Sequence, residues 1–136
     1  MLKMKVLTLT FVLFLPYVIS QNIAQFTPLI AAHQACAART GIQPDLVSGM
    51  LQGRFPNNPV LAQHLFCIHQ RLGVQNGDGS INRNRVEQLA GTIAPSASPE
   101  RIQQVINTCA VDRGSPGATA LEMDRCLYNS AGAALG

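Results

Sequence analysis

The sequence predicts an all-α protein of six helices that disulfide bonds hold together. Apolar residues recur at steps of three and four along most of the chain, and no convincing segment alternates apolar and polar residues as a strand would. Prolines, glycines and capping residues divide the chain into about six such pieces. Four cysteines follow an apolar leader, a combination typical of disulfide-bonded proteins of oxidising compartments.

The leader occupies residues 1–20. Lys3 and Lys5 precede an almost continuous apolar run over residues 6–15, and a small residue ends the segment. This pattern predicts a secretory signal peptide. The remaining residues 21–136 then form a single domain by size. No later segment reaches the ~18 apolar residues that a membrane-spanning helix needs.

The mature chain carries almost no net charge. The full chain has ten basic and seven acidic residues, and Lys3 and Lys5 leave with the leader, so eight arginines remain against seven acids. The arginines form no basic stripe with interleaved aromatic residues. We therefore expect no nucleic-acid partner.

The first two helices follow from apolar spacing and proline placement. A helix is predicted over residues 21–40, because Ile23, Phe26 and Ile30 keep one face apolar. A short second helix over residues 44–51 begins at a proline, which suits a first helical turn. A glycine follows closely after each segment, as is typical of helix ends.

The third helix begins at Asn58, a capping residue, followed by Pro59 in the first turn. Four apolar residues then recur at steps of four, three and four, namely Leu61, Leu65, Ile68 and Leu72. A turn-rich loop over residues 73–79 separates this helix from a fourth one. The fourth helix carries Val86 and Leu89 and ends near a glycine.

The last two helices have equally local signals. Ser98 and Pro99 mark the start of a fifth helix, which carries Cys109. A loop over residues 112–117 follows, and a sixth helix surrounds Cys126. We expect the ten residues after Cys126 to fray rather than to close over a cavity as a lid.

The cysteine spacing favours disulfides over metal ligation. Gaps of 30, 41 and 16 residues separate the four cysteines, and none is the short step typical of a zinc site. Four cysteines allow three pairings, and the spacing leaves all three open. If cysteines adjacent in the sequence pair, each bond contributes about 3 to 4 kcal/mol in the chain-entropy model.

The stretch Asn76-Gly-Asp-Gly-Ser-Ile-Asn82 is similar to the middle of an EF-hand calcium loop. In that register the first ligand position holds Val74 and the last holds Arg85, where calcium needs carboxylates. We therefore expect an ordinary loop there, and no metal or cofactor in the protein.

The remaining polar residues do not predict an enzyme. His33, His64 and His69 lack the i, i+4 spacing of a helical metal pair, so each is expected to be a surface or half-buried residue. A histidine at the rim of a pocket remains a weak candidate for a pH switch. The chain has no Gly-x-Ser-x-Gly elbow, no glycine-rich phosphate loop and, with two disulfides, no free thiol, so we expect no catalytic residues.

Two short motifs lie in successive gaps between the cysteines. The stretch Gly53-Arg-Phe-Pro56 lies in the first gap and the turn Asn76-Gly-Asp-Gly79 lies in the second. With the gap lengths and the leader, they make the whole mature chain resemble the insect odorant-binding proteins, the pheromone- and general odorant-binding family of six-helix secreted carriers.

The family's full pattern has six cysteines, and two of them are missing here, at Gln63 and near Gly117. The chain therefore resembles the four-cysteine minus-C branch. That resemblance implies two bonds, Cys36–Cys67 and Cys109–Cys126. Because the missing pair would join the third helix to the last, we expect side-chain packing alone to hold that seam and the last helix to loosen first.

The resemblance also implies a function. It implies a secreted, extracellular carrier that binds small hydrophobic molecules, such as odorants, pheromones or similar lipophiles, in an internal cavity and performs no catalysis. It allows a membrane receptor at delivery and a monomer or weak dimer, without stable membrane insertion. The expected cavity lining is apolar or aromatic, and comprises Phe26, Ile30, Met50, Leu65, Phe66, Val86, Leu89, Val105, Ile106, Met123, Leu127 and Tyr128. The alternative is a saposin-like membrane-active or lipid-extracting protein, against which the near-neutral mature charge argues.

Overall fold

The computed structural model describes residues 27–135, with side chains through residue 130. The predicted signal peptide, and Phe26 in the predicted first helix, lie outside the described residues. Within the described part, helices follow one another in the predicted order. They cover residues 27–40, α2 (Pro44–Leu51), α3 (Pro59–Arg71), α4 (Arg83–Ile93), α5 (Pro99–Cys109) and α6 (Pro116–Leu135).

The prediction of an all-α fold is confirmed. The extended pairing found among residues 27–135 is one isolated antiparallel bridge between Gln75 and Ile81, in the loop from α3 to α4. Within the same residues, no helix is both long and apolar enough to cross a membrane.

The predicted capping residues begin the helices that they were expected to begin. The Asn58 side chain accepts hydrogen bonds from the backbone N–H groups of Val60 and Leu61, at 2.9 and 3.1 Å. The Ser98 hydroxyl accepts one from the Arg101 backbone N–H at 3.2 Å. These contacts satisfy backbone donors that the first turn of a helix leaves unpaired.

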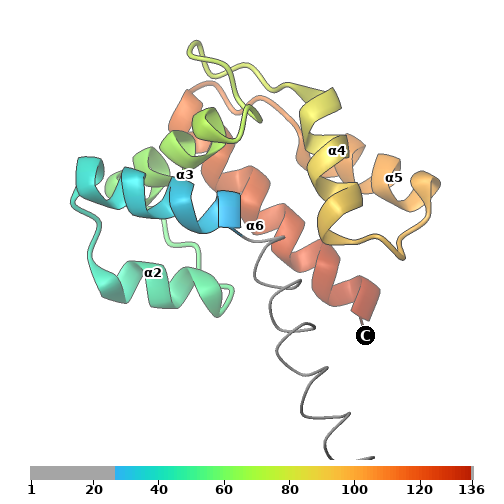
Figure 1. Ribbon diagram of the computed structural model, residues 1–136, viewed down its shortest axis with the longest axis horizontal. Helices are drawn as coiled ribbons and strands as arrows, with labels where there is room; N and C mark the ends of the chain where they lie inside the picture. The colour runs from blue at the N-terminus through green and yellow to red at the C-terminus, as the bar shows by residue number, and fades with distance from the viewer. Residues whose placement is uncertain (1–26, 136) are drawn as a thin grey trace, which may run out of the picture.

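Helix α6 runs through the middle of the molecule (Figure 1). In the view of Figure 1, the helix over residues 27–40, α2 and α3 lie to the left of it, and α4 and α5 lie to the right. Helix α6 packs against α3 and α5, and α4 packs against α5. The central helix therefore contributes side chains to both halves of the interior.

Helix α6 is longer than expected. The predicted fraying after Cys126 is wrong, because the helix continues to Leu135. The sequence of this segment explains the difference, since three of its last six residues are alanine, the strongest helix former.

Two disulfides cross-link the fold. Cys36 is bonded to Cys67, with Cα atoms 5.8 Å apart, and Cys109 is bonded to Cys126, with Cα atoms 5.4 Å apart. This is the pairing that the resemblance implies. The first bond joins the helix over residues 27–40 to α3, and the second joins α5 to α6. The extensive contact between α3 and α6 has no disulfide of its own.

Candidate functional site

One apolar cluster lies on the α3 side of α6. Its buried members come from the turn before α2, from α3 and from the first half of α6, and they are Ile42, Leu61, Leu65, Ala120 and Leu121. Half-buried side chains from α2 and the loop after it pack on this cluster, including Met50 and Phe55. Because these residues come from segments far apart in the sequence, the cluster joins α2, α3 and α6 into one half of the interior.

A second apolar cluster lies on the other side of α6. Its buried members come from the loop after α3, from α4, from α5 and its end, and from α6, and they are Val74, Val86, Ile106, Ala110 and Met123. Leu127 of α6 packs on it, one turn after Met123. Helix α6 thus contributes Leu121 to the first cluster and Met123 to the second.

Most of the predicted lining residues belong to these two clusters. Three are in the first cluster or packed on it, namely Met50, Leu65 and Phe66. Five are in the second or packed on it, namely Val86, Leu89, Ile106, Met123 and Leu127. The structure therefore gathers the predicted residues on both sides of α6 rather than in one continuous patch.

The other predicted lining residues lie apart from these clusters. Ile30 is 48% exposed, and Val105 is half-buried on α5. Tyr128 is 45% exposed, and its ring lies edge-on to Phe55 with ring centres 6.0 Å apart. A Cβ atom at Gly53 would come within 2.3 Å of that ring, so glycine permits the close approach of Tyr128 to the loop after α2.

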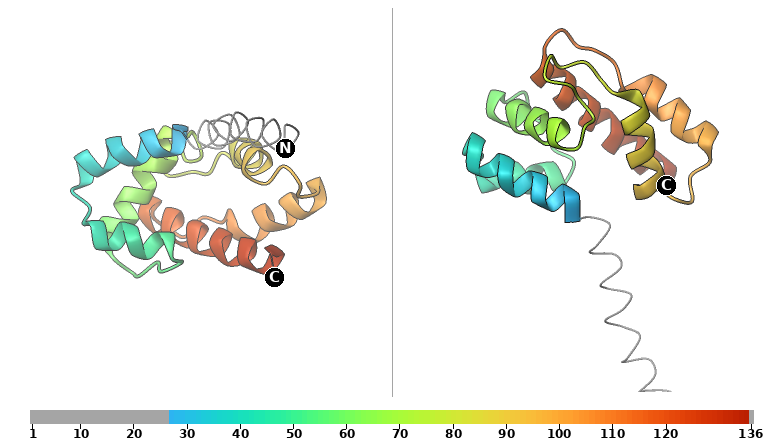
Figure 2. Two further views of the ribbon diagram at one scale, coloured as in Figure 1. Left: turned by 60° about the horizontal axis from the view of Figure 1, so that its bottom comes forward. Right: turned by 45° about the horizontal axis from the view of Figure 1, so that its top comes forward.

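Exposed apolar side chains lie at the start of the first described helix and at the end of α4. In the left view of Figure 2, the start of the described helix over residues 27–40 and the end of α4 both lie above α6. Leu29 and Ile30 on the first of these ends are 41% and 48% exposed, and Ile93 on the second is 61% exposed. These side chains give the start of the first helix and the end of α4 an apolar surface.

One hollow that the structure describes lies elsewhere. It has a volume of about 420 Å³, opens to solvent beside α5 and α6, and is lined largely by charged and polar residues. None of the predicted lining residues within the described part of the chain borders it. The enclosed apolar cavity therefore stays a prediction.

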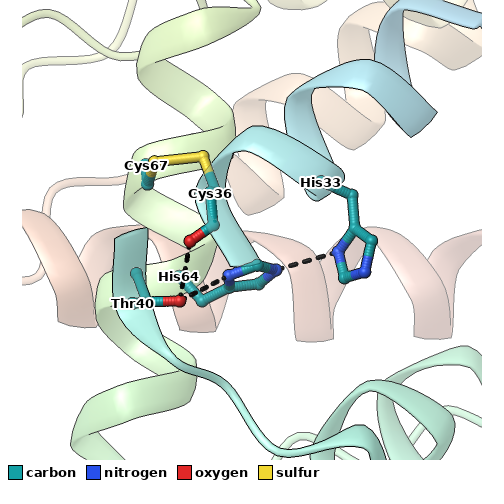
Figure 3. The surroundings of a disulfide bond; sticks show 5 residues. All are labelled: His33, Cys36, Thr40, His64 and Cys67. Atoms are coloured by element: carbon teal, nitrogen blue, oxygen red, sulfur yellow. Dashed lines mark hydrogen bonds between the residues drawn. A yellow bond between two sulfur atoms is a disulfide. The ribbon is translucent and has the colours of Figure 1, made fainter. Parts of the chain in front are cut away.

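A polar network lies beside the Cys36–Cys67 disulfide (Figure 3). The Thr40 hydroxyl donates to the Cys36 carbonyl at 2.9 Å and lies 3.0 Å from Nδ1 of His64. Nε2 of His64 lies 2.9 Å from Nδ1 of His33. The network therefore connects the helix over residues 27–40 to α3 next to the covalent bond.

The hydrogen bonds of this network determine the protonation of His64. Thr40 has one hydroxyl proton and gives it to Cys36, so its oxygen accepts from the Nδ1–H of His64. Nε2 of a neutral His64 then accepts from the Nδ1–H of His33. Burial, with the neighbouring His33, lowers the pKa of His64, which agrees with a neutral ring.

A second histidine on α3, His69, has hydrogen-bond acceptors at both ring nitrogens. Nδ1 of His69 lies 2.7 Å from Oε1 of Gln75, and Nε2 lies 3.0 Å from Oδ1 of Asp124 on α6. The Gln75 amide N–H groups donate to the carbonyls of Gly79 and Pro116, so its oxygen faces His69 as an acceptor. Both ring nitrogens of His69 face acceptors, which requires the imidazolium form.

The partners of His69 raise its pKa. Burial of the ring lowers the pKa, but the charge of Asp124 and the hydrogen bonds from Asp124 and Gln75 together outweigh burial. The ion pair crosses the seam between α3 and α6. The expectation that packing alone holds this seam is therefore wrong, because a charged histidine and its hydrogen bonds also hold it.

The same seam contains Gln63 and Gly117, the two positions where the resemblance places a missing pair of cysteines. A Cβ atom at Gly117 would lie 3.2 Å from Cβ of Ala62 and 3.4 Å from the side-chain nitrogen of Gln63. The two positions therefore face each other across α3 and α6, as the resemblance implies.

The expected exposure of two histidines is wrong. His64 is fully buried and His69 is 6% exposed, whereas His33 is half-buried as expected. The helical spacing contained the missed signal: His64 follows Leu61 by three residues, and His69 follows Leu65 by four. Both histidines therefore share a face with buried leucines.

The loop that is similar to an EF-hand uses its own polar groups. The Asp78 carboxylate accepts from the backbone N–H and the hydroxyl of Ser80, at 2.9 and 2.6 Å, and these bonds lower the pKa of Asp78. Nε of Arg85 donates to the Leu72 carbonyl at 2.8 Å. Among the described residues, no group of three or more His, Cys, Asp or Glu side chains could hold a metal ion.

Comparisons with known proteins agree with this architecture. A family model described as the PBP/GOBP family matches residues 21–130. The B1 protein of Tenebrio molitor is 22% identical over 92 residues, which cover 68% of this chain and 69% of that protein. The solved structure of the odorant-binding protein dmelOBP28a from Drosophila melanogaster has a TM-score of 0.67 at 14% identity, over 84% of this chain and 95% of that one.

Proposed function

Because this chain belongs to the PBP/GOBP family, the insect odorant-binding proteins, we propose that it is a secreted carrier that binds small hydrophobic molecules in its interior. The family and the fold are those of small-ligand binding proteins, not of enzymes. The proposed ligands are odorants, pheromones or similar lipophiles, which the protein would carry through an aqueous fluid.

The main support in the structure is the pair of apolar clusters on either side of α6. Both clusters contain residues that were predicted as lining, such as Leu65 in the first and Met123 in the second. The half-buried members, such as Leu89 and Leu127, pack on the second cluster and keep part of their apolar surface exposed. A guest that lies along α6 would contact apolar atoms of both clusters, because α6 contributes side chains to each.

The exposed apolar ends beside α6 support a route for the guest. The side chains of Ile30 and Ile93 are exposed to water. An apolar guest that passes between them would cover part of this surface. Exposed apolar side chains near a binding interior are typical of ligand entry sites.

Ordinary energetics make such binding favourable. A guest that buries about 300 Å² of apolar surface gains about 7 kcal/mol. Burial of the lining adds to this free energy, and the loss of translational and rotational freedom subtracts from it. We therefore expect dissociation constants in the micromolar range. A bound guest would also raise the melting temperature by mass action.

The leader and the disulfides support secretion. Residues 1–20 have the pattern of a signal peptide, and both disulfides need an oxidising compartment. Proteins of this family are secreted. Delivery to a membrane receptor belongs to this proposal, as does action as a monomer or weak dimer.

Displacement of a fluorescent hydrophobic probe tests the proposal. The monomeric mature protein should bind one probe molecule, and medium-chain alcohols or esters should displace it. Leu127→Trp, which enlarges a half-buried side chain of the second cluster, should weaken probe binding. Leu51→Trp is the matched control, because Leu51 is 73% exposed.

Two results would contradict the proposal. One is a probe that binds equally well to the two tryptophan variants, or that apolar guests fail to displace. The other is release of dye from liposomes by the mature protein at concentrations where it binds no probe, which would favour the saposin-like alternative.

A further inference from the structure

The hollow beside α5 and α6 has the composition of a site for an anion. Its volume is about 420 Å³, and its lining consists of Arg101, Arg113, Glu122, Arg125, Cys126, Asn129 and Ser130. We call this hollow the arginine groove. Three of the eight arginines of the mature chain line it, together with a single acidic residue.

One of these arginines is already occupied. The Arg125 guanidinium pairs with Glu122 on the same helix, and it also donates to the Phe55 carbonyl and to the Asn57 side chain. The charge of Glu122 is thereby compensated. Arg125 therefore holds the loop after α2 against α6, and its guanidinium group already has partners within the protein.

In the part of the chain that the structure describes, the other two guanidinium groups have no partner. Within the described residues, the side chains of Arg101 and Arg113 form no hydrogen bond and no ion pair. Arg101 lies at the start of α5 and Arg113 in the loop before α6, so two separate segments bring uncompensated charge to one groove. The net formal charge of the lining is therefore positive by two.

The groove also offers neutral hydrogen-bonding groups on a cross-linked base. Asn129 and Ser130 add an amide and a hydroxyl to the lining. Cys126 is bonded to Cys109, so the disulfide holds α5 and α6 together at the groove. Along α6 the lining extends from Glu122 to Ser130, which is about 12 Å at the helical rise.

The acidic residues beside the two free arginines do not neutralise the groove. The Asp112 carboxylate accepts from the Gly114 backbone N–H at 2.8 Å and lies 3.4 Å from the Thr119 hydroxyl. Glu100 is exposed at the start of α5 and forms no ion pair among the described residues. Neither of these acids lines the groove.

We propose that the arginine groove is a second binding site, for a small organic molecule with two negative charges, and that Arg101 and Arg113 bind those charges. A guanidinium group presents a planar fork of N–H donors that matches a carboxylate or a phosphate. The recognised chemistry is therefore a dicarboxylate or a phosphate monoester. This site goes beyond the proposed function, because it lies outside both apolar clusters and needs no apolar guest.

Nuclear magnetic resonance titration tests the proposal with defined probes. Adipate, a six-carbon dicarboxylate, should shift the side-chain N–H resonances of Arg101 and Arg113 and the amide resonances of Asn129 in a saturable way. Hexanoate has the same chain length and one charge, so it should bind more weakly. Phenyl phosphate, titrated separately, shows whether the groove also accepts a phosphate monoester.

Two matched variants assign any binding to the groove. The double variant Arg101→Gln/Arg113→Gln should weaken adipate binding about tenfold or more, because both charge-assisted contacts are lost. The control Arg39→Gln/Arg71→Gln removes the same charge from two exposed arginines outside the groove and should change affinity by less than about twofold.

Several outcomes would overturn the proposal. Adipate and hexanoate that bind equally well would show that the second charge is not recognised. An equal loss of affinity in the two double variants would show attraction by net charge alone. Binding to vesicles that contain phosphatidylserine, without binding of adipate or phenyl phosphate, would assign the groove to a membrane surface instead.

Discussion

Helix α3 meets two neighbours through seams of different chemistry. Against the helix over residues 27–40 it has the Cys36–Cys67 disulfide and a buried neutral histidine, His64. Against α6 it has no disulfide and a buried charged histidine, His69. We call these the covalent seam and the ionic seam. Both histidines lie on one helix, yet burial and the neighbouring His33 lower the pKa of His64, whereas Asp124 and Gln75 outweigh burial and raise the pKa of His69.

The comparison shows how protonation is encoded by hydrogen-bond partners rather than by burial alone. His64 has one donor and one acceptor as neighbours, which suits a neutral ring. His69 has two acceptors, one of them a carboxylate, which suits the imidazolium ion. The disulfide of the covalent seam does not titrate, whereas the histidine contacts of both seams depend on pH, with opposite signs.

Removal of the disulfide in the covalent seam should lower the stability most. In Cys36→Ser/Cys67→Ser we expect the free energy of unfolding to fall by about 3 to 4 kcal/mol, because the bond closes a loop with a sequence separation of 31. Chemical denaturation under non-reducing conditions measures the change. Cys109→Ser/Cys126→Ser, with a separation of 17, should lose slightly less. A loss below about 1 kcal/mol would contradict this account of the seam.

Adding a disulfide should convert the ionic seam into a second covalent one. Gln63→Cys/Gly117→Cys places thiols at facing positions, and we expect a gain of about 3 kcal/mol, reduced by crowding of Ala62. Hydrogen exchange is the more specific measurement. In the natural protein, amides of α6 should exchange faster than those of α3, and the new bond should remove the difference. Equal protection of the α3 and α6 amides from hydrogen exchange in the natural protein would contradict this prediction.

Loss of the charged histidine should have an intermediate effect. His69→Gln removes a charge-assisted hydrogen bond, and we expect a loss of about 2 kcal/mol at mildly acidic pH. The folded-state pKa of His69 is raised above 6.5, so its contribution is complete below pH 6.5 and disappears as the pH rises through the folded-state value. The difference in unfolding free energy between the natural protein and the variant should therefore shrink at alkaline pH.

Asp124→Asn provides the control for this charge effect. Asparagine keeps an acceptor for Nε2 of His69 but removes the charge that raises its pKa. The variant should be less stable at acidic pH and close to the natural protein at alkaline pH. A stability difference that is constant over the whole pH range would show that the ion pair is not the source.

Loss of the neutral histidine, His64, should change the stability least. The pH dependence of its contribution should have the opposite sign to that of His69. The folded-state pKa of His64 is lowered, so its contribution is present above pH 6.5 and is lost as the pH falls through the folded-state value. We expect the free energy of unfolding to fall as the pH drops below 6.5, because only the unfolded state then gains the proton readily. His64→Gln should flatten this part of the stability profile. An unchanged acidic slope in that variant would contradict the assignment.

Local sequence signals were sufficient to predict where α3 and α5 begin, although they did not predict how far α6 extends. Asn58 and Ser98 begin α3 and α5 because their side chains satisfy nearby backbone donors, and this contact needs no knowledge of the rest of the chain. The disulfide pairing was not accessible in this way. Cysteine spacing leaves three pairings open, and only the family resemblance selected the one that the structure has.

The ionic seam could not be predicted from local signals, because its two charges are 55 residues apart in the sequence. Spacing could have placed His69 on the buried face of α3, but it could not have named Asp124 as the partner. The apolar lining was predicted as a set of core-facing positions. A filled and a hollow core share the same periodicity, so the cavity itself was beyond the reach of the sequence pattern.

The most direct test of the proposed carrier function is an isotope-filtered nuclear Overhauser measurement on the mature protein with a saturating medium-chain alcohol. If the guest lies along α6 in the interior, its methylene protons should contact methyl groups of both clusters, such as Leu65 in the first and Ile106 and Met123 in the second. Contacts confined to exposed side chains such as Leu51, or no contacts at saturation, would contradict an interior binding site.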